Sequence, residues 1–445
     1  MRLPKNPPDR RQLWHEIREQ PGRLEAVLEA SAITVPGEKY VHWDRLKYSK
    51  RPADLSLEEW WLALKLARSR MAKSIPLVDT KSAPFLFGMP DPIGEQLHNI
   101  DQDAAGQIEM ADQQITNPVT RNRFIYHCLV EEAITSSQLE GASTTHRVAK
   151  EMLRTNRPPK DQSEMMIRNN YLAMQRVRQL RDQPLTEPML LELHTILTAG
   201  TLDDPTASGR FRRSDELVEV RDSYNEVYHT PPEAGELSER LTAMLDFANG
   251  KTPGYFLHPV VRSIILHFWL AYDHPFIDGN GRCARTLFYW SMLRQGYWLC
   301  EFLSISQIIK NAPAKYGMAF LCTESDENDL TYFILYHLDV ILRSIRELHE
   351  YTSRTSQAMR QTQKMMHASG ALNHRQLAVL THALRHPDAE YTMQSHKVSH
   401  NVTHQTSRTD LYDLVDRGLL TRCKIGRTFY FYPADDLERR IRELK

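Results

Sequence analysis

Apolar residues recur with helical spacing through most of the chain. From about residue 122 onward this pattern dominates, and one helical stripe contains Ile125, Cys128, Leu129 and Ala133. Further helices are predicted over residues 164–182, 186–199, 233–248, 260–272, 282–294, 304–311 and 329–350. The earlier segment SLEEWWLALKLARSRM opens with Ser56 and has Glu59 three residues later, which is a capping box at the start of another helix. The chain is therefore predicted to be mainly α-helical.

Three stretches depart from the helical pattern. Residues 1 to about 50 carry short apolar pieces such as KYVHWDRL, which could form strands or loops. Residues 73–98 are rich in Pro and Gly and indicate an irregular connection. Residues 209–230 alternate partly around Val218, Val220 and Val227, which predicts a β-hairpin that turns at Ser223-Tyr224-Asn225. Pro231-Pro232 would introduce the helix that follows.

The pattern changes again in the last hundred residues. Residues 352–371 are polar and indicate a linker, which could be helical. Three helices are then predicted at 373–386, 393–400 and 403–417, the last of them ending at Gly418. The segment TRCKIGRTFYFYP indicates two short strands around a turn at Gly426. Three helices followed by a two-stranded wing is the element order of a winged helix-turn-helix, predicted here for residues 372–445.

Composition and charge exclude several classes of protein. The 445 residues include 56 Lys or Arg and 56 Asp or Glu, so no net charge draws the whole molecule to nucleic acid or anionic lipid. No run of about 18 apolar residues occurs, and the start MRLPKNPPDRRQLW lacks the apolar stretch of a signal peptide, so we expect no membrane span and a cytoplasmic location. The five widely spaced cysteines indicate isolated thiols packed as small hydrophobic residues.

The segment HPFIDGNGRCAR, residues 274–285, concentrates the chemistry of the chain. It lies between two strongly apolar patterns and is predicted to end one helix and open the next. Gly279 and Gly281 leave the start of that helix without side chains, and its unpaired N–H groups form an anion site suited to phosphate. Arg282 and Arg285 lie three residues apart on one face of the first turn.

Two more residues of this segment complete a site for nucleotide chemistry. Asp278 offers one oxygen ligand to Mg²⁺ held jointly with phosphates. His274 could accept a proton near neutral pH. Taken singly, the glycines could form only a tight turn, His274 could be structural, and the two arginines could be surface charges. The segment is neither a Walker A loop nor a Rossmann fingerprint.

The segment resembles, at every specified position, the H-P-F-x-[DE]-G-N-G-R-x-x-R signature of Fic-domain proteins. The resemblance implies a helical fold and transfer of AMP from ATP to a Ser, Thr or Tyr hydroxyl of a target protein. It implies that His274 deprotonates the hydroxyl and that Asp278 holds Mg²⁺. It assigns the anion hole to Gly279, Asn280 and Gly281, the β-phosphate side to Arg282 and the γ-phosphate to Arg285.

Further features follow from the same resemblance. The Doc branch, which transfers phosphate, has Lys at the position of Gly281, so Gly favours nucleotidyl transfer. The predicted hairpin corresponds to the family's flap, which would align the backbone of the target by strand addition. Tyr316 falls where the family often has an adenine-pocket tyrosine, although a role in core packing is an equal alternative.

An upstream motif points to inhibition. Ser136-Ser137-Gln138-Leu139-Glu140-Gly141 resembles the [ST]-x-x-x-E-[GN] helix that inhibits Fic domains. A Glu140 carboxylate paired with Arg285 would occupy the guanidinium needed by the γ-phosphate, and ATP could not then align its α-phosphate for attack. The same Glu could instead position a water for AMP removal. The chain thus divides into an N-terminal region (1–98), a Fic domain with this inhibitory helix near 136–141 (99–351), the linker (352–371) and the winged helix (372–445).

The winged helix suggests an alternative function, DNA binding. Gln405, Arg408 and Thr409 would face a major groove, and the wing adds Arg422, Lys424 and Arg427. Residues 371–445 contain 12 Lys or Arg against 9 Asp or Glu, a modest electrostatic footprint. His396, His400 and His404 are predicted to be solvent-exposed, with a helix break at Asn401-Val402. The rival interpretations are a DNA-binding regulator whose Fic domain senses nucleotide, and a Fic enzyme that removes AMP or uses another nucleotide. Homodimerisation is a further expectation.

Overall fold

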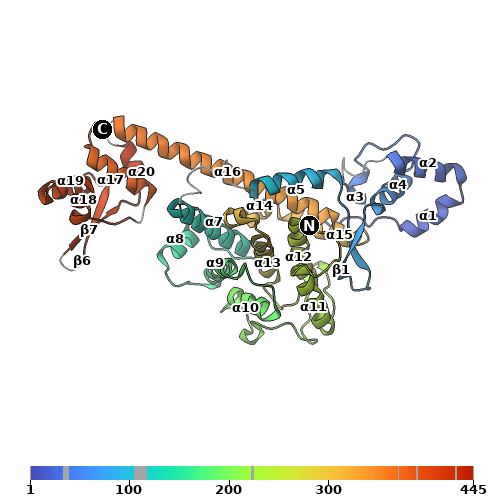
Figure 1. Cartoon of the computed structure of the whole chain (residues 1–445). Helices are drawn as coiled ribbons and strands as arrows, with labels where there is room; N and C mark the ends of the chain where they lie inside the picture. Colours follow the sequence, from blue (N-terminus) through green and yellow to red (C-terminus); the bar gives the residue numbers. More distant parts are fainter. Residues whose placement is uncertain are drawn as a thin grey trace. The chain divides into compact units, whose positions relative to one another are not determined.

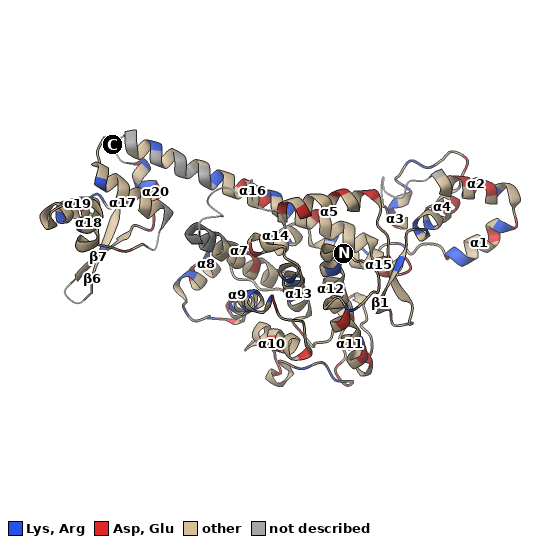
Figure 2. Cartoon of the chain, in the orientation of Figure 1, with Lys and Arg blue, Asp and Glu red and all other residues tan. Residues whose placement is uncertain are grey.

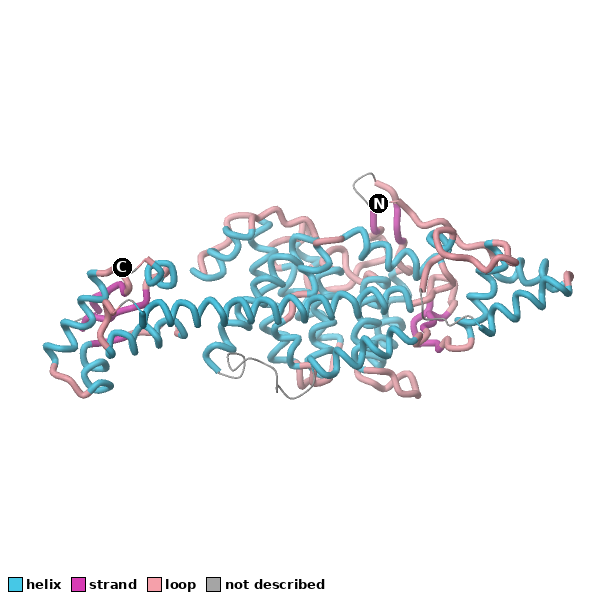
Figure 3. Tube along the Cα trace, turned by 90° about the horizontal axis from the view of Figure 1, so that it is seen from above, coloured by secondary structure: helices cyan, strands magenta, loops and turns pink. Residues whose placement is uncertain are grey.

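The structure is a computed structural model that describes residues 2–33, 40–104, 118–221, 225–368, 370–386, 389–425 and 428–443. Most of the chain is helical and the strands are short, so the predicted mainly α fold is confirmed (Figures 1 and 3). Two compact units are present. The first comprises residues 1–107 and 126–346, and the second comprises 108–125 and 347–445. Acidic and basic side chains are interspersed along the helices (Figure 2).

The first unit begins with four helices, three of them within residues 1–50, where strands or loops were expected, and the fourth being the predicted helix that opens at Ser56. They are α1 (Arg10–Arg18), α2 (Pro21–Ile33), α3 (Trp43–Leu46) and α4 (Leu57–Ser69). Their apolar faces meet around Val27, Leu46 and Trp61, which are almost fully buried. The predicted capping box is confirmed, since the Ser56 side chain accepts from the N–H of Glu59 and the Glu59 carboxylate accepts from the N–H of Ser56.

The prediction of an irregular connection over residues 73–98 is wrong. Strands β1 (Lys73–Val78) and β2 (Pro84–Phe87) form an antiparallel hairpin, and α5 (Asp91–Ala104) follows. A two-stranded sheet has only edge strands, so Pro76 can lie within β1 without removing a bond that the sheet needs. Alternate residues Ile75, Leu77, Phe85 and Phe87 are buried, which is the strand signal that the prolines obscured.

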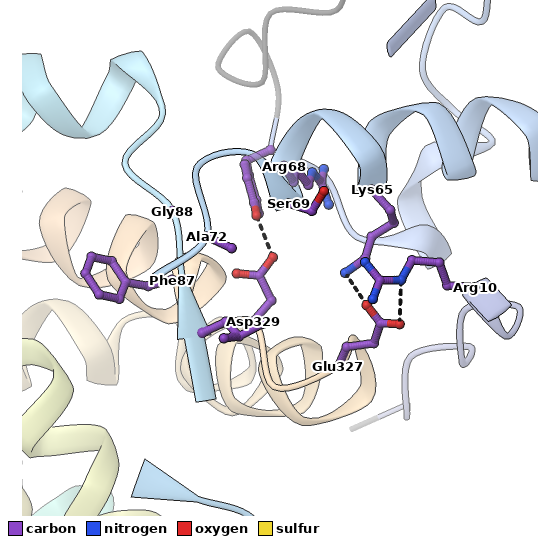
Figure 4. A pocket seen from close by; sticks show the side chains of 11 residues that line it. Arg10, Lys65, Arg68, Ser69, Ala72, Phe87, Gly88, Glu327 and Asp329 are labelled. Atoms are coloured by element: carbon purple, nitrogen blue, oxygen red, sulfur yellow. Dashed lines mark hydrogen bonds and ion pairs between the residues drawn. The ribbon is translucent and has the colours of Figure 1, made fainter. Parts of the chain in front are cut away.

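A charged cavity lies where α4 meets β2 and the loop before α16 (Figure 4). Lys65 Nζ is 2.8 Å from an Asp326 oxygen and 3.3 Å from a Glu327 oxygen, and the Tyr40 hydroxyl donates to Asp329 at 2.5 Å. The cavity volume is about 40 Å³. That volume holds about three water molecules, so the cavity is too small for a nucleotide. Ion pairs and hydrogen bonds surround it.

The centre of the first unit is a pair of buried helices, α12 (Pro259–Asp273) and α13 (Asn280–Arg294). Nearly every side chain of both helices is buried, as their continuous apolar patterns predicted. The surrounding elements are α7 (Pro118–Leu139), α8 (His146–Thr155), α9 (Gln162–Leu180), α10 (Glu187–Thr198), η1 (Pro205–Ala207), η2 (Ala234–Glu236), α11 (Leu237–Ala248), η3 (Trp298–Phe302), α14 (Ile305–Lys310), α15 (Pro313–Ser325) and α16 (Thr331–Ala368).

Most predicted helices of this region are confirmed, with three differences. Helices α8 and α15 were not predicted, and α11 begins after a short 3-10 turn instead of at residue 233. Helix α16 continues to Ala368, so most of the stretch predicted as a linker is helical. Within the described residues, no helix combines the length and apolar character that crossing a bilayer requires.

The predicted hairpin before α11 is confirmed. Strands β3 (Val220–Arg221) and β4 (Val227–His229) pair antiparallel, with Val220 opposite His229. Asn225 has a positive φ of 64°, as a turn residue can. The other two predicted turn residues, Ser223 and Tyr224, lie outside the described residues.

The second unit contains the predicted helices and wing strands. Its elements are α17 (His374–Arg385), β5 (Tyr391–Thr392), α18 (Met393–His400), α19 (His404–Asp416), β6 (Leu420–Ile425), β7 (Thr428–Pro433) and α20 (Leu437–Arg442). The sheet order is β5-β7-β6, and its core includes Leu380, Leu411, Leu414 and Phe431. Gly426 and Arg427 lie outside the described residues. The element order fits the predicted winged helix, and that assignment stays a prediction.

Two expectations for individual residues are wrong. His396 is buried and not solvent-exposed. Its Nε2 lies 3.1 Å from the buried Asp410 carboxylate, which also accepts a hydrogen bond from Arg375. The predicted helix break is confirmed at Asn401, whose φ is 49°. The five cysteines are unpaired, but Cys423 is exposed and does not pack as a small hydrophobic residue.

Candidate functional site

The segment 274–285 ends one helix and opens the next, as predicted, with residues 274–279 forming the loop after α12 and residues 280–285 the first turns of α13. His274 caps the C-terminus of α12 with a left-handed φ of 46°, and Gly279 precedes α13 with a φ of 86°. A Cβ at Gly279 would also come within 3.0 Å of the Thr198 side chain, so both conformation and space favour glycine there. The loop therefore presents the bare N-terminus of a buried helix.

The half-buried His274 is held neutral, with a lone pair on the ring nitrogen that could take up a proton. Its Nδ1 lies 3.1 Å from the carbonyl oxygen of Ala271. A carbonyl only accepts, so Nδ1 carries the hydrogen and Nε2 keeps its lone pair. Burial lowers the pKa of His274 to about 4, and the ring is therefore neutral at physiological pH.

Asp278 keeps an exposed carboxylate at the loop. Its Oδ1 accepts from the N–H of Gly279 at 2.6 Å, and its Oδ2 accepts from Arg282 at 3.0 Å. The side chain is 53% exposed. Each oxygen has further lone pairs, so the residue fits Mg²⁺ bound through one carboxylate together with phosphates and water.

The side chain of Asn280 closes the loop. Its Nδ2 donates to the carbonyl of Phe276 at 2.8 Å, and its Oδ1 accepts from the N–H of Phe276 at 3.0 Å. The Nδ2 group has a second hydrogen besides the one donated to Phe276, and the predicted place of Asn280 in the anion hole stays a prediction.

Arg282 and Arg285 are both buried, so the alternative that they are surface charges is wrong. Arg282 donates to the Leu197 carbonyl at 2.9 Å as well as to Asp278. Arg285 donates from Nε to the Ser136 hydroxyl at 2.9 Å, and from NH2 to the Ser136 carbonyl at 3.0 Å. Two guanidinium groups are thus fixed beside the N-terminus of α13.

Glu140 lies on that N-terminus, one residue past the end of α7. Its Oε1 accepts from Arg285 at 2.8 Å, and a Cβ at Gly281 would overlap the carboxylate. Burial alone would raise the pKa of Glu140, but Arg285 dominates with help from Arg282 and His274, and the pKa is lowered. The predicted pairing of Glu140 with Arg285 is confirmed, and an ionised carboxylate lies at the guanidinium that is predicted to bind the γ-phosphate.

Comparison with known proteins decides the identity of this region. Residues 184–292 match the Fic/DOC family. They are a Fic domain.

Relatives and solved structures agree with this assignment. A 111-residue stretch is 36% identical to "Protein adenylyltransferase Fic" of Drosophila willistoni, covering 24% of this chain and 20% of that protein. A protein of the same name from Nematostella vectensis is 30% identical over 117 residues, or 26% of this chain and 25% of that protein. The chain thus spans about a fifth to a quarter of the length of these relatives.

The crystal structure of a Fic family protein from Desulfovibrio desulfuricans G20 shares the fold. Its TM-score is 0.50 at 18% identity, over 77% of this chain and 95% of that chain.

Tyr316, on α15 beyond the matched Fic domain, packs in the interior of the first unit. The Tyr316 hydroxyl lies 2.8 Å from Nε2 of His267, and its ring contacts Phe320 and Tyr336. Burial raises the pKa of Tyr316 to about 12. The contacts of the core-packing alternative are therefore present, and adenine binding by Tyr316 stays a prediction.

Two further residues position the Fic loop and were not predicted. The buried ring of His194 stacks on Phe276 with centroids 3.8 Å apart, and its Nε2 lies 3.0 Å from the Asp278 carbonyl. Arg212 donates to the His274 carbonyl at 2.9 Å and to the Pro232 carbonyl, while its own N–H donates to the Pro275 carbonyl at 2.9 Å. Arg212 therefore ties both ends of the hairpin segment to the loop that carries His274.

Proposed function

We propose that the chain transfers AMP from ATP to a Ser, Thr or Tyr hydroxyl of a target protein. The observation that carries the proposal is the hydrogen bond that places the ring hydrogen of His274 on Nδ1. The lone pair of Nε2 is thereby left free beside the N-terminus of α13. His274 takes the hydroxyl proton, the oxygen bonds to the α-phosphorus, and the bond to the β-phosphate oxygen breaks, releasing pyrophosphate. A regulator that only sensed nucleotide would have no use for a base held in this state.

The other residues of the site bind and orient ATP. The N–H groups at the start of α13 and the guanidinium of Arg285 donate hydrogen bonds to the phosphates, and positive charge there stabilises the charge that develops at the α-phosphate. Asp278 would hold Mg²⁺, which neutralises charge between the α- and β-phosphates. His194 and Arg212 hold the loop so that His274 faces the reacting oxygen.

Glu140 is proposed to keep this reaction switched off. Its carboxylate occupies the guanidinium of Arg285 and lies against Gly281. A γ-phosphate brought to Arg285 would meet a like charge, so ATP would bind with its α-phosphate out of line for attack. AMP removal by a water held at Glu140 and transfer from another nucleotide remain the alternatives within the same site.

Labelled ATP distinguishes the reaction types. Glu140→Gly protein with lysate as acceptor should take label from [α-³²P]ATP and none from [γ-³²P]ATP, and adding His274→Ala should abolish it. Label from the γ-position would mean phosphoryl transfer instead. Absence of label with either isotope would overturn transfer from ATP, and [α-³²P]UTP would then test another donor.

A second function, DNA binding, is favoured by the charges on α19 and β6. The guanidinium of Arg408 lies 5.5 Å from the Tyr412 ring centroid, and that of Arg422 lies 5.1 Å from the same ring. Lys424 lies over Phe429 at 5.7 Å. Among the described residues of this unit, Asp410 pairs with Arg375, Asp413 with Arg417 and Asp436 with Arg440. A basic and aromatic surface thus runs from α19 to β6.

A further inference from the structure

His229, the last residue of flap strand β4, has a partner at each ring nitrogen. Its Nδ1 lies 2.7 Å from Oε2 of Glu324 on α15, and its Nε2 lies 2.7 Å from the backbone oxygen of Tyr272. The side chain is only 9% exposed, and its ring packs on the Tyr272 ring with centroids 4.6 Å apart. One imidazole therefore joins the flap to α15 and to α12, two residues before His274.

Both partners can only accept hydrogen bonds. A carbonyl oxygen has no proton to give, and a carboxylate has none when ionised. A neutral imidazole has a single N–H, so it could satisfy one partner and would turn a lone pair toward the other. The geometry at both nitrogens thus requires the doubly protonated imidazolium.

The charges around the ring favour the same state. Tyr272 lies in the last turn of α12, where free carbonyls and the helix dipole favour a cation. The titratable groups that face His229 are Glu324 on α15, with Tyr272, Asp273 and His274 at the end of α12. Asp273 is already paired with Arg240 at 2.7 Å, which leaves Glu324 as the main counter-charge.

We propose that His229 is a cationic clamp that positions the flap beside His274 and releases it when the imidazolium loses its proton. The clamp rests on the proposed adenylyl transfer, in which the flap aligns the target. On deprotonation to solvent, one N–H disappears, and the lone pair that remains faces either the Glu324 carboxylate or the Tyr272 carbonyl. His229 is thus a positioning residue that acts on the protein acceptor and not on ATP.

The sign of the pH effect follows from the direction of the pKa. Burial alone would lower the pKa of His229, but the bond and charge of Glu324 and the bond to Tyr272 raise it overall. The clamp is therefore complete below the ordinary histidine pKa of about 6.5 and is lost as pH rises through the raised pKa. Transfer to a protein acceptor should decline on the alkaline side, while ATP binding should not.

Nuclear magnetic resonance of histidine-labelled protein tests the clamp without relying on activity. In ¹⁵N-histidine protein, with His229 assigned by loss of its signals in His229→Gln, both ring nitrogens should be protonated at pH 6. The titration midpoint should lie above the ordinary value of about 6.5. Glu324→Gln keeps an acceptor but removes the charge, and should lower the midpoint by about one pH unit or more. Glu233→Gln, an exposed acid in the same segment, is the matched control and should leave it unchanged.

The activity readout uses the same variants in the Glu140→Gly background. Glu324→Gln should move the alkaline decline of acceptor labelling to lower pH and leave KM for ATP unchanged, whereas a merely structural role would lower activity equally at every pH. A titration midpoint of His229 at or below about 6.5, or a midpoint that does not respond to Glu324→Gln, would overturn the clamp. If Glu140→Gly labels nothing while the midpoints shift as expected, the clamp stands and the proposed transfer fails.

Discussion

At the scale of single residues, backbone contacts decide which side chains are reactive. The Ala271 carbonyl fixes the hydrogen of His274 on Nδ1, as the proposed role of a base requires, and Asn280 closes the loop by binding both backbone polar groups of Phe276. The motif showed which residues matter. It could not show that Arg282 and Arg285 are buried, because burial depends on Leu197 and Ser136, which are far away in the sequence.

The lowered pKa of His274 predicts the acid limit of activity, that is, the pH below which activity is lost. With its pKa lowered to about 4 by burial, His274 stays neutral at pH 6 and is protonated only as pH falls toward 4. Initial rates of the Glu140→Gly protein should therefore be level between about pH 5.5 and 6.5 and fall below that range. Glu140 itself raises this pKa, so its removal should move the limit further down. An acid limit near 6.5 would contradict a buried base.

At the scale of elements, α7 is attached to α13 by contacts repeated along one face. Glu132, Ser136 and Glu140 are spaced by four residues, and their partners Arg285 and Tyr289 have the same spacing on α13. The buried carboxylate of Glu132 accepts from the Tyr289 hydroxyl and the Ser304 hydroxyl at 2.9 Å, and from the Ser306 N–H at 3.1 Å. Glu132 thus anchors the helix that delivers Glu140.

Removing that anchor should weaken both the fold and the inhibition. Glu132→Ala leaves several buried donors without an acceptor, which should cost about 3 kcal/mol of unfolding free energy and lower the thermal midpoint by several degrees. Nucleotide labelling should rise above wild type, because Glu140 is held less firmly. Glu151→Ala, at an exposed position of α8, is the control. Equal thermal midpoints for the two variants would contradict the anchoring role.

The elements that were predicted are those whose signal is local. The flap hairpin, the capping box at Ser56 and the buried α12–α13 pair follow from short-range patterns. Helix α1 was not predicted although it also has a local signal, since Asp9 caps it and Leu13 and Ile17 share a face. The contacts of His194 and Arg212 could not be predicted, because they join the loop to residues more than 60 positions earlier in the chain.

At the scale of the whole molecule, a chain without net charge contains a local excess of positive charge. The full sequence balances 56 cations against 56 anions, while residues 371–445 hold 12 against 9. Ion pairing within that unit leaves Arg408 and Arg422 beside the Tyr412 ring, where they could reach phosphates. Nucleic-acid binding would therefore depend on this unit and would be sensitive to salt.

Fluorescence anisotropy with duplex DNA measures that dependence on the full chain. Arg408→Ala combined with Arg422→Ala should weaken binding and reduce the slope of log affinity against log salt by about two, one for each phosphate that is no longer neutralised. The control pair Arg439→Ala and Arg440→Ala removes cations of the same unit that pair with Asp436, and should change the slope less. Equal slopes in the two double variants would contradict a DNA-binding surface on α19 and β6.

Intact-mass spectrometry after incubation with ATP and Mg²⁺ tests the central claim, that Glu140 restrains a transferase whose base is His274. Wild type, Glu140→Gly and Glu140→Gly with His274→Ala are compared, each with and without lysate. The account predicts AMP adducts on the chain or on lysate proteins with Glu140→Gly, few with wild type and none with the double variant. Equal adducts in wild type and Glu140→Gly would contradict the inhibition, and adducts that persist without His274 would contradict its role as the base.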